Sequence, residues 1–311
     1  MIAYDCHVHS AFSTDSEENP ENIVNQAQKL GLRGFCLTDH MDLYYPEQCI
    51  EEGGGDFTFD PGLYFERLEE LKERCRFTCD VLAGIEIGLR NEPELKDKCI
   101  SEYTELTEKY PFDFVIGSTH CLANYDPYYG GYWDGKSAEE GFGEYWSAVA
   151  ENIAGCSCFD TVGHLDYLVR YVAREAALVS LKNRKDKDNV TLTAEQLAEK
   201  NFYGKYLYRP SDYADKTDEI LRLIIKNGKA LEVNTAGMKY GLGFAHPKKE
   251  ILMRYRELGG ELITVGSDAH SAGELAGSFN GVCDLLEELG YKYYFVYRNR
   301  KPVGKSLKNG L

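Results

Sequence analysis

The stretch "MIAYDCHVHS", residues 1–10, joins an apolar run to one carboxylate and two imidazoles. The apolar residues 1–4 predict the beginning of a buried strand, and side chains two apart in a strand share one face. Asp5, His7 and His9 would therefore point the same way where the strand ends. Imidazoles and a carboxylate together suit Zn²⁺, Mn²⁺ or Fe²⁺. The alternative is a polar strand end whose histidines are satisfied by hydrogen bonds.

Short apolar runs like this one recur along the chain. They lie at residues 2–6, 34–38, 81–87, 113–117, 160–163, 229–234 and 262–266. Amphipathic stretches separate several of them, at residues 21–32, 63–76, 217–228 and 248–260. Alternation of strands with helices implies a parallel sheet, and about seven units predict a closed or nearly closed α/β barrel. No linker rich in Pro, Gly or Ser divides the chain, so we expect a single domain over residues 1–311.

The composition narrows the possible functions. The net charge is −16 and no basic block occurs, so we expect no binding to nucleic acid. This charge also repels an anionic substrate, so a phosphate site would need local cations or metal ions. The ten cysteines form no C-x-x-C pair, which argues against a zinc ribbon or a disulfide framework. No apolar run is long enough for export or a membrane span, so we expect a cytoplasmic protein without membrane contact.

The histidines follow the ends of the predicted strands. Six of the seven histidines lie at the carboxyl-terminal end of an apolar run, and Glu86 and Asp268 lie at such ends too. In a barrel these ends meet on one face, where active sites are built. Nine side chains are therefore candidate metal ligands, namely His7, His9, Asp15, His40, Glu86, His120, His164, Asp268 and His270.

Nine candidate ligands exceed what one ion needs. A single catalytic zinc uses about three protein ligands, so the set predicts two or three divalent ions, which can be Zn, Fe or Mn. A carboxylate would bridge them. Clustered ions supply a hydroxide nucleophile at neutral pH and clamp the oxygens of a phosphoryl group during in-line displacement. The pattern therefore favours phosphoryl chemistry.

The motifs "DCHVHS", "LTDH", "GIEIG", "GSTH", "GHLD", "EVNTAG" and "GSDAH" follow one another from Asp5 to His270. In this order they resemble the polymerase-and-histidinol-phosphatase (PHP) superfamily, and within it the monofunctional histidinol-phosphate phosphatases. The resemblance implies a distorted TIM-like (β/α)7 barrel with a trinuclear metal site at the carboxyl-terminal ends of its strands. The stretch "YFVYRNRKPVGKSL" near the carboxyl terminus, residues 294–307, also resembles the end of such phosphatases, though weakly.

The resemblance also implies how the ligands divide among three ions. The first ion would be held by His7, His9, Glu86 and Asp268. The second would be held by His120, His164 and the bridging Glu86. The third would be held by Asp15, His40 and His270. Many members of the superfamily have a histidine at the position of Asp15, and a carboxylate can coordinate there as well.

Further residues are expected to act on the phosphate. Arg170 and Arg209 resemble the family's phosphate-binding arginines, because a guanidinium fork pairs well with phosphate oxygens; surface ion pairs are the alternative. The hydroxyl of Ser118 could assist them. Asp166 is our candidate for protonating the leaving alkoxide, and capping of the next helix is its alternative. With Glu86, these two arginines and Asp166 form the predicted catalytic set.

Five residues are expected to support the ligands or the substrate. Asp5 and Asp39 would orient ligand histidines. Glu232 and Asn234 end the sixth apolar run and face the site by strand alternation, so we expect substrate contacts from them. His246 either meets an imidazole of the substrate or is a loop residue.

One segment is expected to lie over the site. Residues 172–208 predict a lid-like helical insert. Within it, the charged run "KNRKDKD" at residues 182–188 is expected to be solvated surface.

The function predicted from these features is hydrolysis of a phosphomonoester, and the resemblance implies L-histidinol phosphate as substrate, in histidine biosynthesis. A broader PHP-type phosphoesterase is the main alternative, since loops decide the substrate. An amidohydrolase that cleaves C–N bonds also opens with H-x-H on a barrel strand, but it typically bridges its metals with a carboxylated lysine, and no lysine ends an apolar run here. A non-catalytic metal-binding module should have lost ligands, and none is missing.

Overall fold

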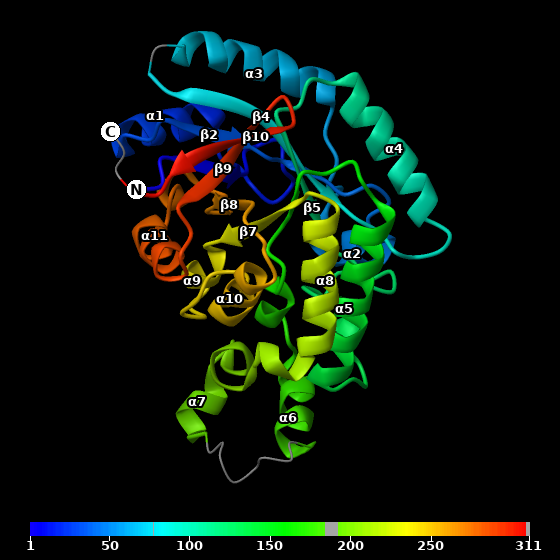
Figure 1. Cartoon of the computed structure of the whole chain (residues 1–311). Coiled ribbons are helices and arrows are strands. Elements are labelled where there is room, and N and C mark those ends of the chain that lie inside the picture. Colours follow the sequence, from blue (N-terminus) through cyan, green and yellow to red (C-terminus); the bar gives the residue numbers. More distant parts are fainter. Residues whose placement is uncertain (77, 184–191, 309–311) are drawn as a thin grey trace.

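Each apolar run of the sequence contains a strand of one parallel sheet (Figure 1). The structure is a computed structural model that describes residues 1–76, 78–183 and 192–308. The strands are β1 (Tyr4–Val8), β2 (Gly34–Leu37), β3 (His40–Met41), β4 (Asp80–Gly88), β5 (Phe114–Ser118), β6 (Thr161–Val162), β7 (Ala230–Asn234) and β8 (Ile263–Gly266). They lie in the order β1-β2-β4-β5-β6-β7-β8, every pair is parallel, and β3 pairs with β4 beyond β2.

The two edges of this sheet meet, which makes a nearly closed barrel. Beyond the end of β1, the His9 N–H donates to the Ala269 carbonyl (2.8 Å), and the Asp268 N–H donates to the His7 carbonyl (2.8 Å). A side chain at Gly266 would collide with His7, so glycine permits the close approach of β8 to β1. The strands β1, β2, β5, β7 and β8 are buried at every residue, as expected for a parallel sheet covered on both sides. The predicted barrel is confirmed.

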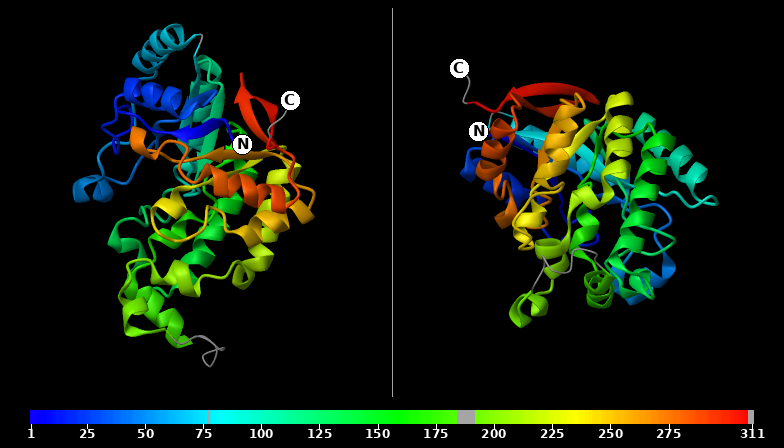
Figure 2. Two further views of the ribbon diagram at one scale, coloured as in Figure 1. Left: turned by 90° about the vertical axis from the view of Figure 1, so that its left-hand side faces the viewer. Right: turned by 60° about the horizontal axis from the view of Figure 1, so that its bottom comes forward.

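Helices connect the successive strands and lie outside the sheet (Figure 2). In the described part of the chain, the connecting and closing helices are α1 (Pro20–Leu30), α3 (Pro61–Cys75), α4 (Lys96–Lys109), α5 (Ala138–Gly155), α8 (Ala214–Lys226), α10 (Lys249–Glu257) and α11 (Phe279–Glu288). Additional helices in the loops are α2 (Glu47–Cys49), α6 (Arg174–Asn183), α7 (Ala194–Ala198) and α9 (Ala236–Lys239). The four amphipathic stretches of the sequence fall on α1, α3, α8 and α10.

Side-chain caps fix where several of these helices begin. The Asn19 side chain accepts a hydrogen bond from the second residue of α1, and Asp60 accepts two from the first turn of α3. Ser137 and Glu140 form a reciprocal capping box at the start of α5. Gly31 ends α1 in the left-handed region with φ of 70°, where glycine carries no steric cost.

An antiparallel hairpin that the sequence did not predict covers the amino-terminal end of the barrel. Its strands are β9 (Tyr293–Arg298) and β10 (Lys301–Ser306). Asp80 at the start of β4 forms an ion pair with Arg298, and Asp160 just before β6 forms one with Arg300. Because the hairpin closes this end, a functional site is left to the opposite end of the strands.

The predicted insert at residues 172–208 contains α6, α7 and a π-helical turn at Tyr203–Leu207. α6 and α7 lie at the bottom of Figure 1, away from the hairpin of β9 and β10. Residues 184–191, which include most of the charged run at 182–188, lie outside the described residues. The lid-like role of the insert and the single-domain assignment stay predictions.

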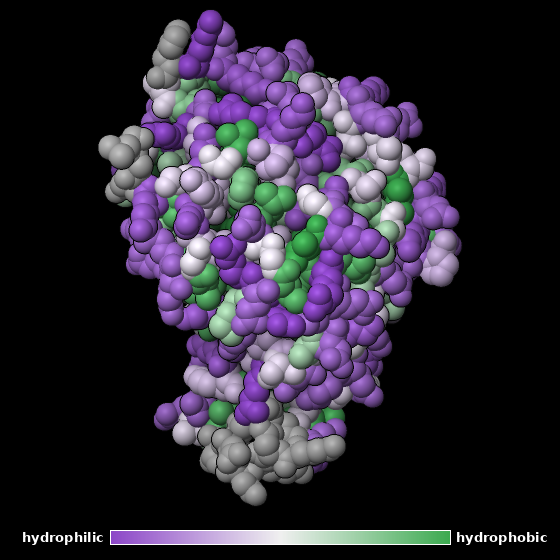
Figure 3. Space-filling model, in the orientation of Figure 1, coloured by the Kyte–Doolittle hydropathy of each residue, from purple (hydrophilic) through white to green (hydrophobic). Residues whose placement is uncertain are grey.

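The outer surface matches the acidic, polar composition. Figure 3 shows a face of mostly hydrophilic residues on which hydrophobic side chains form small separate patches. Among the helices in the described part of the chain, none combines the length and the apolar character that crossing a membrane requires.

Candidate metal centre

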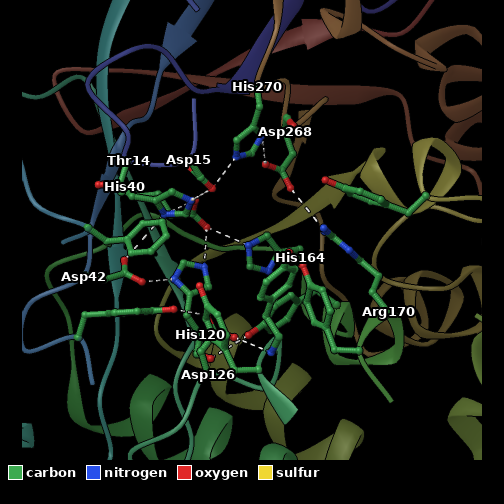
Figure 4. A pocket seen from close by; sticks show the side chains of 18 of the residues that line it. Thr14, Asp15, His40, Asp42, His120, Asp126, His164, Arg170, Asp268 and His270 are labelled. Atoms are coloured by element: carbon green, nitrogen blue, oxygen red, sulfur yellow. Dashed lines mark hydrogen bonds and ion pairs between the residues drawn. The ribbon is translucent and has the colours of Figure 1, made fainter. Parts of the chain in front are cut away.

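The nine predicted ligands converge at the carboxyl-terminal ends of the strands (Figure 4). His7 belongs to β1 and Glu86 to β4, and both are fully buried. His40 stands on β3, and His9, His120, His164 and Asp268 each follow a strand end by one or two residues. His270 lies farther beyond β8, and Asp15 lies in the loop between β1 and α1. The converging ends of parallel strands therefore do what the sequence pattern suggested: they bring distant histidines together.

Glu86 lies at the centre of this cluster, and its two oxygens face different imidazoles. Oε2 lies near ring nitrogens of His7 (3.0 Å), His40 (3.3 Å) and His9 (3.5 Å). Oε1 lies near Nε2 of His164 (2.9 Å) and His120 (3.2 Å), and it accepts a hydrogen bond from the Ser118 hydroxyl (2.5 Å). A carboxylate placed between two sets of nitrogen donors has the position of a bridging ligand.

Three groups of donor atoms are close enough together to hold one ion each. They consist of His7, His9 and Asp268; of His40, Glu86 and His120; and of His9, Asp15, His40 and His270. The groups resemble the predicted division with three differences: His9 and His40 are each shared, Glu86 belongs to the second group alone, and His164 contacts Glu86 without belonging to a group. The third group is nearest to solvent, because the Asp15 side chain is 37% exposed and that of His270 is 24% exposed.

The donor set also fits divalent transition metals by its chemistry. Nδ1 of His40 is buried and accepts or donates no hydrogen bond within the described structure, which leaves it available as a ligand. Burial by itself raises the pKa of Glu86, but the surrounding His7, His40 and His120 imidazoles hold this pKa well below its usual range. Imidazole nitrogens and carboxylate oxygens are ligands that Zn, Fe and Mn share.

Buried acceptors behind the ligands fix the orientation of the rings. Nδ1 of His7 lies 2.6 Å from Oε1 of Glu232, and Nδ1 of His120 lies 2.6 Å from Oδ2 of Asp42. Each contact turns Nε2 of the ring toward Glu86. The sequence analysis missed Asp42, although its position two residues after His40 in "HMD" could have indicated it by strand alternation.

The predicted orienting residues Asp5 and Asp39 act less directly than expected. Asp39 accepts a hydrogen bond from the Ser13 hydroxyl (3.0 Å), which in turn lies 3.0 Å from Nδ1 of His9. Asp5 accepts from the Ser267 hydroxyl (2.6 Å) and main-chain N–H (2.9 Å), so it ties β1 to the segment after β8. Neither carboxylate contacts an imidazole ring among the described hydrogen bonds.

A cavity of about 440 Å³ opens beside the metal ligands. Arg170 stands on its wall, with Nη1 3.9 Å from Oδ2 of Asp268 and its guanidinium carbon 3.8 Å from the ring centre of Tyr240. The buried Nε of Arg170 has no hydrogen-bond partner in the described structure. Arg209 is half-buried just before the 3-10 helix Pro210–Tyr213 and is not among the described residues that line this cavity.

Four other predicted residues are buried behind the ligands, and none is among the described lining residues of the cavity: Asp166, Glu232, Asn234 and His246. Oδ1 of Asp166 lies 2.7 Å from Nδ1 of His246, and its Oδ2 accepts from the Lys248 N–H (3.0 Å). This geometry does not support a general acid at Asp166, because its carboxylate is fully buried, is held by His246 and the Lys248 N–H, and is not among the described residues that line the cavity.

The expected substrate contacts of β7 are corrected in the same way. Oε2 of Glu232 accepts from the His164 N–H (2.7 Å), and Oδ1 of Asn234 accepts from the Ala236 N–H (2.9 Å). Strand alternation does turn Glu232 and Asn234 into the barrel, as predicted. The metal ligands already fill the space in front of them, so these side chains support the ligands instead.

Comparison with known proteins gives consistent results. A family model described as "PHP domain" matches residues 5–236. The histidinol-phosphatase of Lactococcus lactis is 29% identical to this chain over 99% of both chains. The probable histidinol-phosphatase of Clostridium acetobutylicum is 28% identical over 94% of this chain and 96% of its own length.

Solved structures agree with this picture. A crystal structure of histidinol phosphate phosphatase from Lactococcus lactis, in complex with zinc, L-histidinol and phosphate, superposes with a TM-score of 0.76 at 26% identity and covers 97% of this chain and 99% of its own. A structure from Listeria monocytogenes shares the fold, with a TM-score of 0.67 at 18% identity over 90% of this chain and 100% of its own.

Proposed function

The chain belongs to the PHP domain family, and we propose that it is a metal-dependent phosphomonoester hydrolase that converts L-histidinol phosphate to L-histidinol and phosphate. The observation that carries this proposal is the position of Glu86 between two sets of imidazoles, which suits a bridged metal cluster. The substrate is inferred from the Lactococcus lactis phosphatase, whose structure holds L-histidinol and phosphate. We assign the reaction to histidine biosynthesis in the cytoplasm.

The cluster would hold two or three divalent ions, with zinc, iron or manganese as candidates. His7, His9 and Asp268 would bind one ion, Glu86 with His40, His120 and His164 a second, and the more exposed Asp15 and His270 a third. Such ions, when bound, activate water as a nucleophile at neutral pH and neutralise the charge of phosphoryl oxygens.

The chain's own residues would position the reacting groups. Glu232 and Asp42 hold protons on Nδ1 of His7 and His120, which keeps the Nε2 lone pairs of these rings directed at the centre. Arg170 would bind a phosphate oxygen, because its guanidinium faces the cavity beside Asp268 and part of it lacks a partner. The aromatic rings of the cavity wall would exclude water from the bound ester.

Metal content tests the first half of the proposal. Protein purified in the presence of zinc or manganese should carry more than one ion per chain, and a chelator should remove these ions together with phosphatase activity. Elemental analysis and phosphate release in the same samples measure both. At most one ion per chain after metal-replete purification would contradict a bridged cluster.

A substrate panel tests the second half. Phosphate release should be measured with L-histidinol phosphate, other primary phosphomonoesters and phosphodiesters on metal-loaded enzyme. We expect kcat/KM for L-histidinol phosphate to exceed the other values at least tenfold. Equal values across the monoesters would point to a broader phosphoesterase, and no release from any ester would point to a module without this activity.

A further inference from the structure

Asp126 is a carboxylate of the cavity wall that the proposed reaction does not use. It follows β5 in the loop before the 3-10 helix Gly130–Trp133 and lines the cavity beside His120. Its Oδ2 accepts a hydrogen bond from the Tyr45 hydroxyl (2.7 Å), and its Oδ1 accepts one from the Tyr128 N–H (2.8 Å). Both contacts hold the side chain in place, and both donors are neutral.

Asp126 differs in this respect from the other acidic residues of the cavity. Asp15, Glu86 and Asp268 belong to the groups of candidate metal ligands. Asp42 is bound to the ring of His120 (2.6 Å), and Glu274 forms an ion pair with Lys239 (2.9 Å). Within the described part of the chain, Asp126 is the acidic lining residue that has neither a ligand role nor an ion pair.

The surroundings of Asp126 make an unbalanced charge costly there. Burial raises the pKa of Asp126, and the hydrogen bonds from Tyr45 and Tyr128 only oppose this rise. The aromatic rings that line the cavity include those of Tyr45, Phe57, Tyr129, Tyr171 and Tyr240. A cation brought into such a site gains both from the carboxylate and from the faces of the rings.

The charges of the cavity are also separated in space. Figure 4 shows Asp126 beside His120 and Arg170 across the cavity, next to Asp268, with His164 between them. Lys239 lies on the wall with Arg170 and contacts the Asp268 carbonyl (3.2 Å). A ligand that carries a phosphate at one end and a cation at the other matches this arrangement.

We infer that Asp126 binds the ammonium group of the leaving alcohol and thereby selects phosphate esters of amino alcohols over esters of neutral alcohols. The inference rests on the proposed function, because L-histidinol phosphate carries both a phosphate and a primary amine. Asp126 is thus a specificity-determining residue, and the phosphate is bound by other groups of the site.

The test compares Asp126→Asn with the wild-type enzyme on two esters. The substitution preserves the size of the side chain and an oxygen that accepts hydrogen bonds, but it removes the charge. The esters are L-histidinol phosphate and its deamino analogue, 3-(imidazol-4-yl)propyl phosphate, assayed at pH 8, where the imidazole of both is largely neutral and the primary amine of L-histidinol phosphate is still mostly protonated. Glu274→Gln is the matched control, since it removes one negative charge from the same cavity at a residue paired within the chain.

The expected result is a loss of selectivity. In Asp126→Asn, kcat/KM for L-histidinol phosphate should fall at least tenfold, mainly through KM, and the value for the deamino analogue should change less than twofold. The inhibition constant of the product L-histidinol should rise by a similar factor. Glu274→Gln should change kcat/KM for the two esters by the same factor.

Two other results would overturn the inference. They are an equal loss for both esters in Asp126→Asn, which would mean a purely structural role, and no loss for either. Failure of the proposed function has a separate signature, namely wild-type enzyme that hydrolyses other esters but not L-histidinol phosphate. In that case the role of Asp126 is tested with phosphoethanolamine and ethyl phosphate in the same two variants. If the ratio of kcat/KM for phosphoethanolamine to that for ethyl phosphate is the same in Asp126→Asn as in the wild type, the role of Asp126 is rejected.

Discussion

The two ends of the barrel both collect acidic side chains, but the chain treats them differently. At the amino-terminal end, Asp80 is paired with Arg298 and Asp160 with Arg300, and Asp113 accepts a hydrogen bond from the Asn299 N–H (3.0 Å). The hairpin of β9 and β10 provides all three partners. At this end the protein therefore balances its own carboxylates.

At the carboxyl-terminal end, the carboxylates of the candidate metal ligands lie closer to imidazoles than to basic side chains. The carboxylate of Glu86 has five imidazole nitrogens within 3.5 Å. Nη1 of Arg170 lies farther away from its carboxylate, at 3.9 Å from Oδ2 of Asp268. Buried charges need a partner, and a group of nitrogen and oxygen donors without one is what a metal ion completes. The difference teaches that one end serves stability and the other serves binding, as is general for barrels of this kind.

The largest effect on activity should come from a substitution at the centre of the metal-ligand cluster, at the carboxyl-terminal end of the barrel. Glu86→Gln removes the charge of the bridging candidate while keeping its size, so phosphatase activity should fall at least about a hundredfold, more than for loss of a supporting residue. The metal content per chain should fall as well. Phosphate release and elemental analysis measure these changes, and circular dichroism should show that the fold is retained. Near-normal activity would place the bridge elsewhere.

Loss of a residue that orients a ligand should have the next largest effect. Asp42→Ala leaves Nδ1 of His120 without its acceptor, so metal affinity or activity should fall about 10- to 100-fold. Asp113→Ala is the matched control at the other end, where the carboxylate contacts the hairpin and the Ala83 N–H. Zinc titration of both variants measures this effect. If Asp42→Ala bound zinc as tightly as Asp113→Ala, Asp42 would not support the metal site.

Removing a residue that binds phosphate should lower activity less than the two preceding substitutions do. It should also leave metal binding unchanged. A charge-assisted hydrogen bond contributes about 1.5–3 kcal/mol, and each 1.4 kcal/mol is about tenfold in rate. Arg170→Ala should therefore lower kcat/KM at least about tenfold with metal content unchanged. Arg209→Ala changes a residue away from the cavity wall and should cost less. If steady-state kinetics showed equal losses of kcat/KM for the two variants, the position of Arg170 on the cavity wall would not distinguish its role from that of Arg209.

The strands and the ligands could be predicted because both leave local signals. Apolar runs mark the strands, and a polar residue two positions on from a buried one shares its face, as His7 and His9 do with Asp5. The rest depends on contacts between distant segments. Glu232 supports His7 across 225 residues, and nothing near either residue indicates that β7 lies opposite β1.

The same limit explains the residues that were placed wrongly and the element that was missed. Asp166 lies two residues from His164, but β6 has ended at Val162 and a 3-10 helix begins at Tyr167, so strand alternation no longer gives the direction of its side chain. The hairpin of β9 and β10 is an ordinary antiparallel pair whose position follows from Asp80 and Asp160, far away in the sequence. Side-chain direction after a strand end, and partners beyond the neighbouring element, need the structure.

The smallest effect on activity should come from removing an ion pair at the amino-terminal end of the barrel, where the carboxylates are paired within the chain. Arg300→Ala removes the ion pair to the buried Asp160 and the hydrogen bond to the Cys158 carbonyl (2.6 Å), which leaves a carboxylate without its cation. Such a loss costs about 1–3 kcal/mol of the free energy of unfolding, so the melting temperature should fall by a few degrees. At 25 °C the kcat/KM and the metal content should stay within about twofold of wild type. Thermal unfolding and kinetics on the same preparation test this. A fall in metal content without a change in melting temperature would mean that the two ends are coupled, and the division of the barrel into a stabilising and a binding end would fail.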